Sequence, residues 1–221
     1  DNISSEFRTS SFPSSTPTSG VFVGVGQYGK TFRSIDNGTS WDNETCQILE
    51  KSLNGVINGN NTFVAVGDSG RIVKSTDNAS SWINSTSGVS GHYLKGVTFG
   101  NDIFVGVGQT SSCSNSNYVK IINSTDDGST WDSDNSPYEA CRDLYGVSFG
   151  DNTFVGVGQY GKIVRSTDNG DSWDNVTSGV SPYPYGDNLL RGVSFGNNTF
   201  VAVGSDGKII RSTNNGSSWD N

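Results

Sequence analysis

Short runs of β-branched and aromatic residues, separated by Gly, Asn and Asp, follow one another along nearly the whole chain. The fullest set occupies residues 190–195 (Leu-Arg-Gly-Val-Ser-Phe), 199–204 (Thr-Phe-Val-Ala-Val-Gly) and 208–212 (Lys-Ile-Ile-Arg-Ser), followed by 218–220 (Ser-Trp-Asp). β-Branched and aromatic residues favour strands, whereas Gly, Asn and Asp favour turns. The pattern therefore predicts four consecutive short strands in an all-β protein.

The same order of strands recurs along the chain. We expect the first strand of each repeat at 53–57, 94–99, 144–149 and 190–195, and the second at 21–26, 62–67, 103–108, 153–158 and 199–204. Residues 6–12 are expected to replace the first strand of the irregular first repeat. The tryptophans are spaced 41, 49, 42 and 46 residues apart, which is the size of a four-stranded propeller blade. They are Trp41, Trp82, Trp131, Trp173 and Trp219.

Each tryptophan ends an eight-residue motif that we call the box, with the pattern Ser-x-Asp-x-Gly-x-(Ser/Thr)-Trp. Asp and Ser side chains bond backbone amides inside turns, and Gly supplies a positive φ. The box thus predicts a hairpin turn between the third and fourth strands, with acids that are structural rather than catalytic. Ala79 replaces the Gly in one copy and should be strained there. The acid position holds Asp36, Asp77, Asp126, Asp168 and, as a mild departure, Asn214.

The five boxes resemble Asp-boxes, also called BNR repeats, which occur in sialidases, sortilin-type receptors, some glucanases and photosystem II assembly factor-like propellers. The resemblance implies a five-bladed β-propeller of four-stranded antiparallel blades, with a box in each turn between the third and fourth strands. The whole chain, 1–221, is then one domain, and residues 1–5 are expected to pair as the outer strand beside Trp219. The expected blades are 6–46, 52–88, 93–135, 143–179 and 189–221. The family contains enzymes, receptors and scaffolds, so the resemblance does not specify the function.

Composition excludes several classes of function. The net charge of −8 argues against binding to nucleic acid or to an anionic membrane surface. No apolar run reaches the roughly 20 residues that span a bilayer. One His and three scattered Cys are a poor set of metal ligands, and no nucleotide-binding motif is present, so no metal or cofactor is expected.

Candidate binding residues gather on the face opposite the boxes. Seven of the eight tyrosines and the single histidine fall in connections of that face, as do the long connections around 110–118 and 181–188. Exposed aromatic residues on loops above a rigid framework are typical of peptide and sugar sites, although the same rings could instead pack the loops onto the blades. The candidates are Tyr28, His92, Tyr93, Tyr138, Tyr160, Tyr183 and Tyr185.

Catalytic residues cannot be nominated. A glycosidase needs two carboxylates across one bond, and the four Glu residues offer no clear pair. The predicted function is a non-enzymatic, monomeric scaffold that binds a protein or peptide; the alternative is a lectin-like carbohydrate binder, and a glycoside hydrolase is less favoured. A disulfide is expected between Cys113 and Cys141, with Cys46 free, because the first two lie in connections of the same face that can approach each other. The protein is expected to be extracytoplasmic or secreted.

Overall fold

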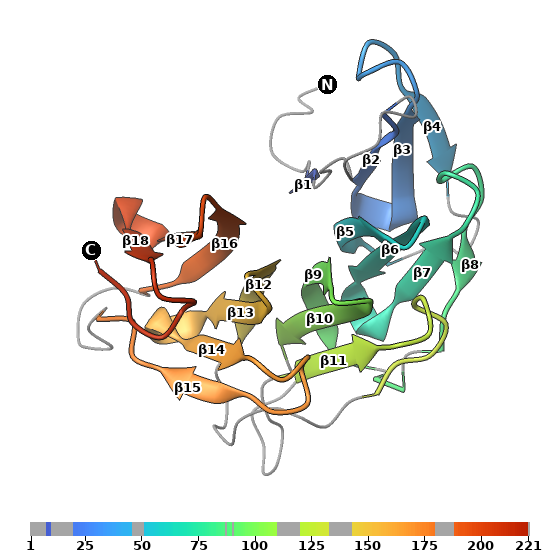
Figure 1. The fold of residues 1–221 in the computed structure, drawn as a ribbon. Helices are drawn as coiled ribbons and strands as arrows, with labels where there is room; N and C mark the ends of the chain where they lie inside the picture. Colours follow the sequence, from blue (N-terminus) through green and yellow to red (C-terminus); the bar gives the residue numbers. More distant parts are fainter. Residues whose placement is uncertain are drawn as a thin grey trace.

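Five antiparallel sheets follow one another in chain order around an open arc (Figure 1). The computed structural model describes residues 8–9, 20–45, 51–86, 88–89, 91–109, 120–132, 143–179 and 188–220. The first sheet contains β1 (Arg8–Thr9), β2 (Phe22–Val25), β3 (Lys30–Ser34) and β4 (Asp42–Thr45), and the second contains β5 (Leu53–Gly59), β6 (Thr62–Gly67), β7 (Ile72–Ser75) and β8 (Ile83–Asn84). The third contains β9 (Tyr93–Gly100), β10 (Ile103–Gln109) and β11 (Lys120–Ser124), and the fourth contains β12 (Leu144–Gly150), β13 (Thr153–Gly158), β14 (Ile163–Ser166) and β15 (Asp174–Val176). The fifth contains β16 (Leu190–Gly196), β17 (Thr199–Gly204) and β18 (Ile209–Ser212).

The repeat predicted from the sequence accounts for this order. Each sheet is a meander in which sequential strands pair, and β1 takes the first position of the first sheet, as expected for 6–12. In the third and fifth sheets the described part of the fourth strand forms a single bridge in each, Asn123–Asp132 and Arg211–Asp220. Residues 1–5, and with them the predicted outer strand beside Trp219, lie outside the described residues.

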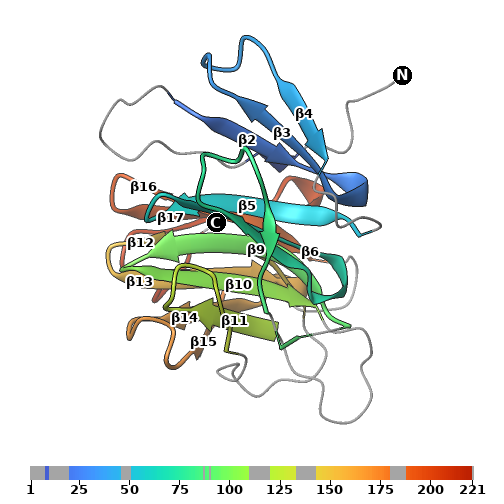
Figure 2. The ribbon, with the colours of Figure 1, turned by 90° about the vertical axis from the view of Figure 1, so that its right-hand side faces the viewer.

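The expected closure of five blades into a ring is not seen, because the first and fifth sheets stand apart across a gap (Figure 1). The innermost strands β5, β9, β12 and β16 contact one another in sequence along the arc (Figure 1), and Figure 2 gives the view of the sheets from the side. Their glycines allow a close approach: a Cβ added to Gly146 would lie 3.0 Å from the Cα of Gly192. The same residue types recur at each of these interfaces, so each should add a similar rotation, and the four together leave the fifth sheet apart from the first (Figure 1).

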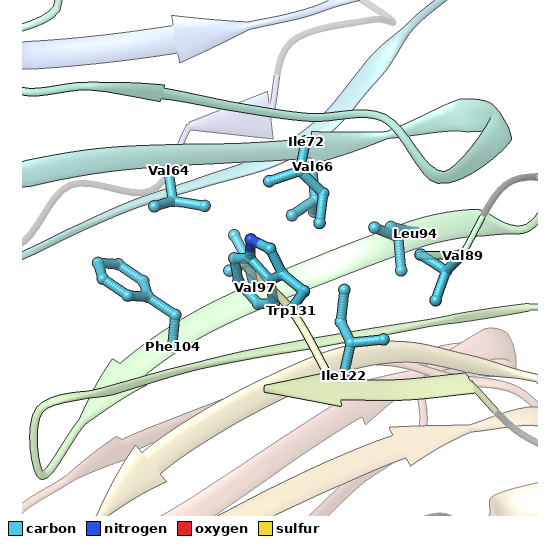
Figure 3. Close-up of a cluster of buried hydrophobic side chains, with 9 residues drawn as sticks. All are labelled: Val64, Val66, Ile72, Val89, Leu94, Val97, Phe104, Ile122 and Trp131. Carbon is cyan, nitrogen blue, oxygen red and sulfur yellow. The ribbon is translucent and has the colours of Figure 1, made fainter. Parts of the chain in front are cut away.

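Apolar clusters between neighbouring sheets form the core. In the cluster of Figure 3, Phe104 is fully buried and lies 4.6 Å from the Phe99 ring and 6.4 Å from the Trp131 ring, measured between centroids. Burying a side chain of this size stabilises the fold by roughly 1.5–3 kcal/mol. The second sheet contributes Val64, Val66 and Ile72, and the other members are Val89, Leu94, Val97, Phe104, Ile122 and Trp131.

The box adopts one hydrogen-bonded turn, illustrated by the copy in the fourth sheet. The Ser166 hydroxyl donates to Asp168 Oδ1 (2.8 Å) and accepts the Gly170 N–H (2.9 Å). The Ser172 N–H donates to Asp168 Oδ1 (3.0 Å), and its hydroxyl donates to the other carboxylate oxygen. These bonds from the Ser172 hydroxyl and amide lower the pKa of Asp168. The box carboxylate therefore has its partners inside its own turn.

Ala79 shows what the glycine position requires. Its φ is +62°, a conformation that L-residues adopt at a cost, so the expected strain is present. In the other four boxes the tryptophan indole N–H donates to the carbonyl of the glycine, at 3.1–3.2 Å. The indole nitrogen of Trp82 is buried and has no partner among the described residues. The Ala79 box therefore lacks one hydrogen bond of the repeat.

Candidate functional site

Tight turns between the second and third strands project side chains from the face opposite the boxes. Four of them are short 3-10 turns: η1 (Gln27–Gly29), η2 (Asp68–Gly70), η3 (Gln159–Gly161) and η4 (Ser205–Gly207). Their central residues, Tyr28, Ser69, Tyr160 and Asp206, all have a left-handed φ of 55–59°. Tyr28 is 63% exposed and Tyr160 is 39% exposed. The turns therefore present these two rings to solvent rather than packing them onto the sheets.

Backbone hydrogen bonds fix two of these turns, η2 and η3, to the neighbouring repeat. The Gly70 N–H donates to the His92 carbonyl (2.6 Å), and the Gly161 N–H donates to the Asn188 carbonyl (2.7 Å). Each bond joins a turn of one sheet to the segment that enters the next. A ligand on this face would meet a preformed surface, which reduces the entropy lost on binding.

A β-bulge at the start of each innermost strand adds a second set of side chains to this face. The pairing register shifts within the sequence Leu-x-Gly-Val, so that residue x is the extra residue of the bulge. A bulge re-aims the side chain that it carries. We call these four residues the bulge residues: Asn54, Lys95, Tyr145 and Arg191. Arg191 is exposed and the other three are half-buried, so the arc carries a polar side chain on four successive sheets.

The bulge residues of the second and third sheets form a polar cluster. Asn54 Nδ2 donates to Asp68 Oδ1 (2.9 Å) and to the Leu94 carbonyl (2.8 Å). Lys95 Nζ lies 3.7 Å from the same Asp68 oxygen and 5.3 Å from the centre of the Tyr93 ring. Asp68 therefore orients Asn54 and neutralises Lys95, whereas Arg191 remains an exposed cation.

His92 lies beside this cluster with a half-buried ring. Burial lowers its pKa, and the positive charge of Lys120 lowers it further, so the imidazole is neutral at pH 7. Its Nδ1 is buried without a partner among the described residues. His92 can thus offer hydrogen bonds to a ligand but no positive charge.

The predicted candidates are only partly brought together. His92 and Tyr93 adjoin the polar cluster, whereas Tyr28 and Tyr160 belong to the first and fourth sheets. Tyr138, Tyr183, Tyr185 and the cysteines Cys46, Cys113 and Cys141 lie outside the described residues. The described ranges contain no group of three His, Cys, Asp or Glu side chains suited to a metal ion, and no helix in them could span a membrane.

The bulge residues were missed by the sequence-based prediction. The signal was the constant sequence Leu-x-Gly-Val, in which only x changes from Asn to Lys, Tyr and Arg. A position that varies inside an otherwise constant structural repeat is free to serve recognition.

The arrangement of sheets defines a β-propeller fold, and the comparison with solved structures supports it. The chain is similar to a structure described as YCF48 bound to D1 peptide, with a TM-score of 0.64 and 16% identity over 97% of this chain and 69% of that one. It is also similar to YCF48 from Cyanidioschyzon merolae, with a TM-score of 0.61 and 16% identity over 90% of this chain and 68% of that one. No protein-family model matches, and no curated protein matches. The resemblance to photosystem II assembly factor-like propellers is therefore confirmed at the level of the fold.

Proposed function

We propose that this protein is a non-enzymatic scaffold that binds an extended peptide segment of a partner protein on the face formed by the turns and the bulge residues. The observation that carries the proposal is the arc of bulge residues, which places four variable side chains on a framework of otherwise repeated residues. The five boxes, which we take to be Asp-boxes, supply that framework from the opposite face.

The chemistry of the arc suits a peptide that carries carboxylates. Arg191 is exposed and able to donate two parallel bonds to one carboxylate, while Tyr93 and Tyr160 offer apolar rings with polar tips. YCF48 is one of the similar folds, and its structure with a D1 peptide shows that such a fold can take a peptide. The identity of 16% transfers the fold to this chain, so the peptide class rests on the arc itself.

A peptide array with acidic, neutral and basic members tests the proposal. We expect wild-type protein to favour peptides with Asp, Glu or a free C-terminal carboxylate, and Arg191→Ala to weaken the best of them by about tenfold or more. This loss corresponds to the roughly 1.5–3 kcal/mol of a hydrogen bond to a charged group. Arg211→Ala is the matched control, because Arg211 is exposed on the same sheet beside the box, at the opposite face. Equal binding by wild type and Arg191→Ala would contradict the assignment.

The exposure of the two turn tyrosines favours carbohydrate as a second candidate ligand. Tyr28 and Tyr160 present faces on which a sugar ring could stack. A glycan array probed with wild type and with the Tyr28→Ala, Tyr160→Ala double variant distinguishes the two functions. Glycan binding that depends on these rings, together with an empty peptide array, would replace the peptide proposal.

A further inference from the structure

Neighbouring sheets pack through the same two faces throughout the arc. The valine face, turned toward the following sheet, carries two residues of the second strand and one at the start of the third; in the fourth sheet these are Val155, Val157 and Ile163. The tryptophan face, turned toward the preceding sheet, carries the second-strand Phe, the central third-strand residue and the box Trp; in the fifth sheet these are Phe200, Ile210 and Trp219. All six side chains are buried where the two faces meet.

A polar contact accompanies this packing and gives it a register. The residue before the box Ser reaches the backbone carbonyl of the fourth residue in the next box. Arg33 Nε donates to the Asn78 carbonyl at 2.6 Å, and Arg165 Nε donates to the Asn215 carbonyl at 2.5 Å. The box glycine lies directly against a valine of the preceding sheet, because a Cβ on Gly216 would be 2.8 Å from Val155 Cγ2. A valine face is thus shaped to receive another box.

The valine face of the fifth sheet is bare. Val201, Val203 and Ile209 are 37%, 46% and 60% exposed, whereas the equivalent residues of the fourth sheet are fully buried. Arg211, which is equivalent to Arg165, is also exposed. This face therefore carries the same three apolar positions and the same arginine position as the valine face of the fourth sheet.

The tryptophan face of the first sheet is bare in the complementary way. Trp41 is 42% exposed, whereas Trp131, Trp173 and Trp219 are 6–7% exposed. Phe22 and Phe32 are only half-buried. Among the described residues, a Cβ on Gly38 would meet only the ring of its own Trp41 within 4 Å. The gap in Figure 1 is therefore bordered by one face of each kind.

The chains of the two similar structures are longer than this chain, and the difference in length gives a size for an occupant of the gap. About 214 residues, 97% of this chain, cover 69% of the first, which makes that chain about 310 residues long and leaves about 95 outside the match. The second gives about the same, because about 199 residues cover 68% of it. A remainder of this size is close to two repeats of 41–49 residues.

We propose that the two bare faces form one docking site whose occupant is a pair of further box-carrying sheets. The pair presents a tryptophan face to Val201, Val203 and Ile209, and a valine face to Trp41 of the first sheet. A second copy of the chain would bring five sheets to the gap, whereas the unmatched part of each similar chain has the length of only about two repeats. Direct contact between the first and fifth sheets would require a larger rotation at each of the four interfaces.

The test adds the occupant to the full chain. Two copies of residues 176–221, one repeat each, are joined after Asn221, so that both new boxes continue the register of Trp219. We expect the extended protein to be monomeric by light scattering, to melt several degrees above the 221-residue chain, and to lose the binding of the apolar dye ANS that the bare faces give the shorter chain. An unchanged melting temperature with new repeats that are digested readily by protease would overturn the proposal.

Val203→Asp supplies the matched control. In the 221-residue chain Val203 is half-exposed, so the substitution should reduce ANS fluorescence and leave the melting temperature nearly unchanged. In the extended chain it should remove most of the increase in melting temperature, because the new carboxylate would be buried. The measurements on the shorter chain stand even if the extended protein does not fold. Three results on the 221-residue chain would each overturn the proposal. One is the absence of ANS binding. Another is a large fall in the melting temperature of Val203→Asp, which would indicate that the chain already buries this face, and the third is a dimer that Val203→Asp separates into monomers.

Discussion

Replacing Gly128 by Ala tests whether the box of the third sheet depends on a left-handed glycine packed against its neighbour. Gly128 is buried with φ +74°; its N–H donates to Ser124 Oγ at 3.0 Å, and its carbonyl accepts the indole N–H of Trp131 at 3.2 Å. An added Cβ would lie 2.8 Å from Cγ2 of Val64 in the second sheet, which is closer than two carbons can approach. The substitution therefore acts on the turn and on the interface together.

The expected loss of stability follows from three terms. A left-handed L-residue costs roughly 1–2 kcal/mol. The overlap with Val64 adds roughly 1–3 kcal/mol of overpacking, and the less flexible unfolded chain returns about 0.4–1 kcal/mol. Gly128→Ala should thus lower the free energy of unfolding by about 2–4 kcal/mol, which is roughly 5–15 °C in melting temperature for a chain of this size.

Gly170→Ala in the fourth sheet is the matched control. Its φ is +86°, but the added Cβ would lie 3.8 Å from its nearest neighbour, Val105 Cγ2, an ordinary contact. Only the conformational terms remain, so about 1 kcal/mol should be lost. Urea titration followed by circular dichroism and tryptophan fluorescence measures both values. Equal losses in the two variants would refute the packing of the box against the preceding sheet.

Four further predictions concern the box acids, the cysteines and the N-terminus. Asp168→Ala should lower the free energy of unfolding by about 1 kcal/mol and leave peptide binding unchanged. Asp168→Asn should be nearly neutral, because Asn214 makes the equivalent bonds to Ser212 and Ser218 in the fifth sheet. If Asp168→Ala lost peptide binding but kept its stability, the carboxylate would be a ligand contact. Hydrogen bonds, of which the one from the Ser81 hydroxyl has the largest effect, lower the pKa of Asp77 to about 2. The box carboxylates therefore bind protons more weakly in the folded protein, and stability should fall as the pH drops from about 4 to about 2; urea midpoints that do not change over this range would contradict it. Peptide mapping without reductant should find Cys113 joined to Cys141, as expected in an oxidising compartment, and free thiols on both would end that prediction. Deleting residues 1–5 should lower the melting temperature, and an unchanged value would count against pairing beside Trp219.

The fold could be predicted from the sequence because each strand and turn of the repeat occurs several times in the same order. The Leu-x-Gly-Val and Ser-x-Asp-x-Gly-x-Ser-Trp patterns each report a local requirement, a tightly packed inner strand and a left-handed turn. The open arc could not be read in this way. The rotation between two sheets depends on how closely strands such as β12 and β16 approach, and no single repeat encodes the sum of these rotations.

The candidate binding face was predicted less completely than the fold. The positions of the turns identified Tyr28, His92, Tyr93 and Tyr160, but the bulge residues were hidden because a bulge exists only relative to the partner strand. Arg191, for example, is one residue of a regular strand in the sequence; only pairing of Leu190 with Gly204 and Gly192 with Val203 shows it to be extra. The charge of Lys95 is compensated by Asp68, 27 positions earlier, a relation that local patterns do not contain.

The chain of sheet-to-sheet contacts has a consequence for how the protein comes apart. Each inner sheet is held by two apolar interfaces, whereas the first and fifth are held by one each. Stability in such a one-dimensional array is close to a sum over repeats and nearest-neighbour couplings, so opening begins at the ends and moves inward. The amides of β10 should therefore exchange with solvent most slowly, and those of β2 and β17 should be released first. The third sheet, flanked by two others on each side, is the last part of the molecule to lose its order.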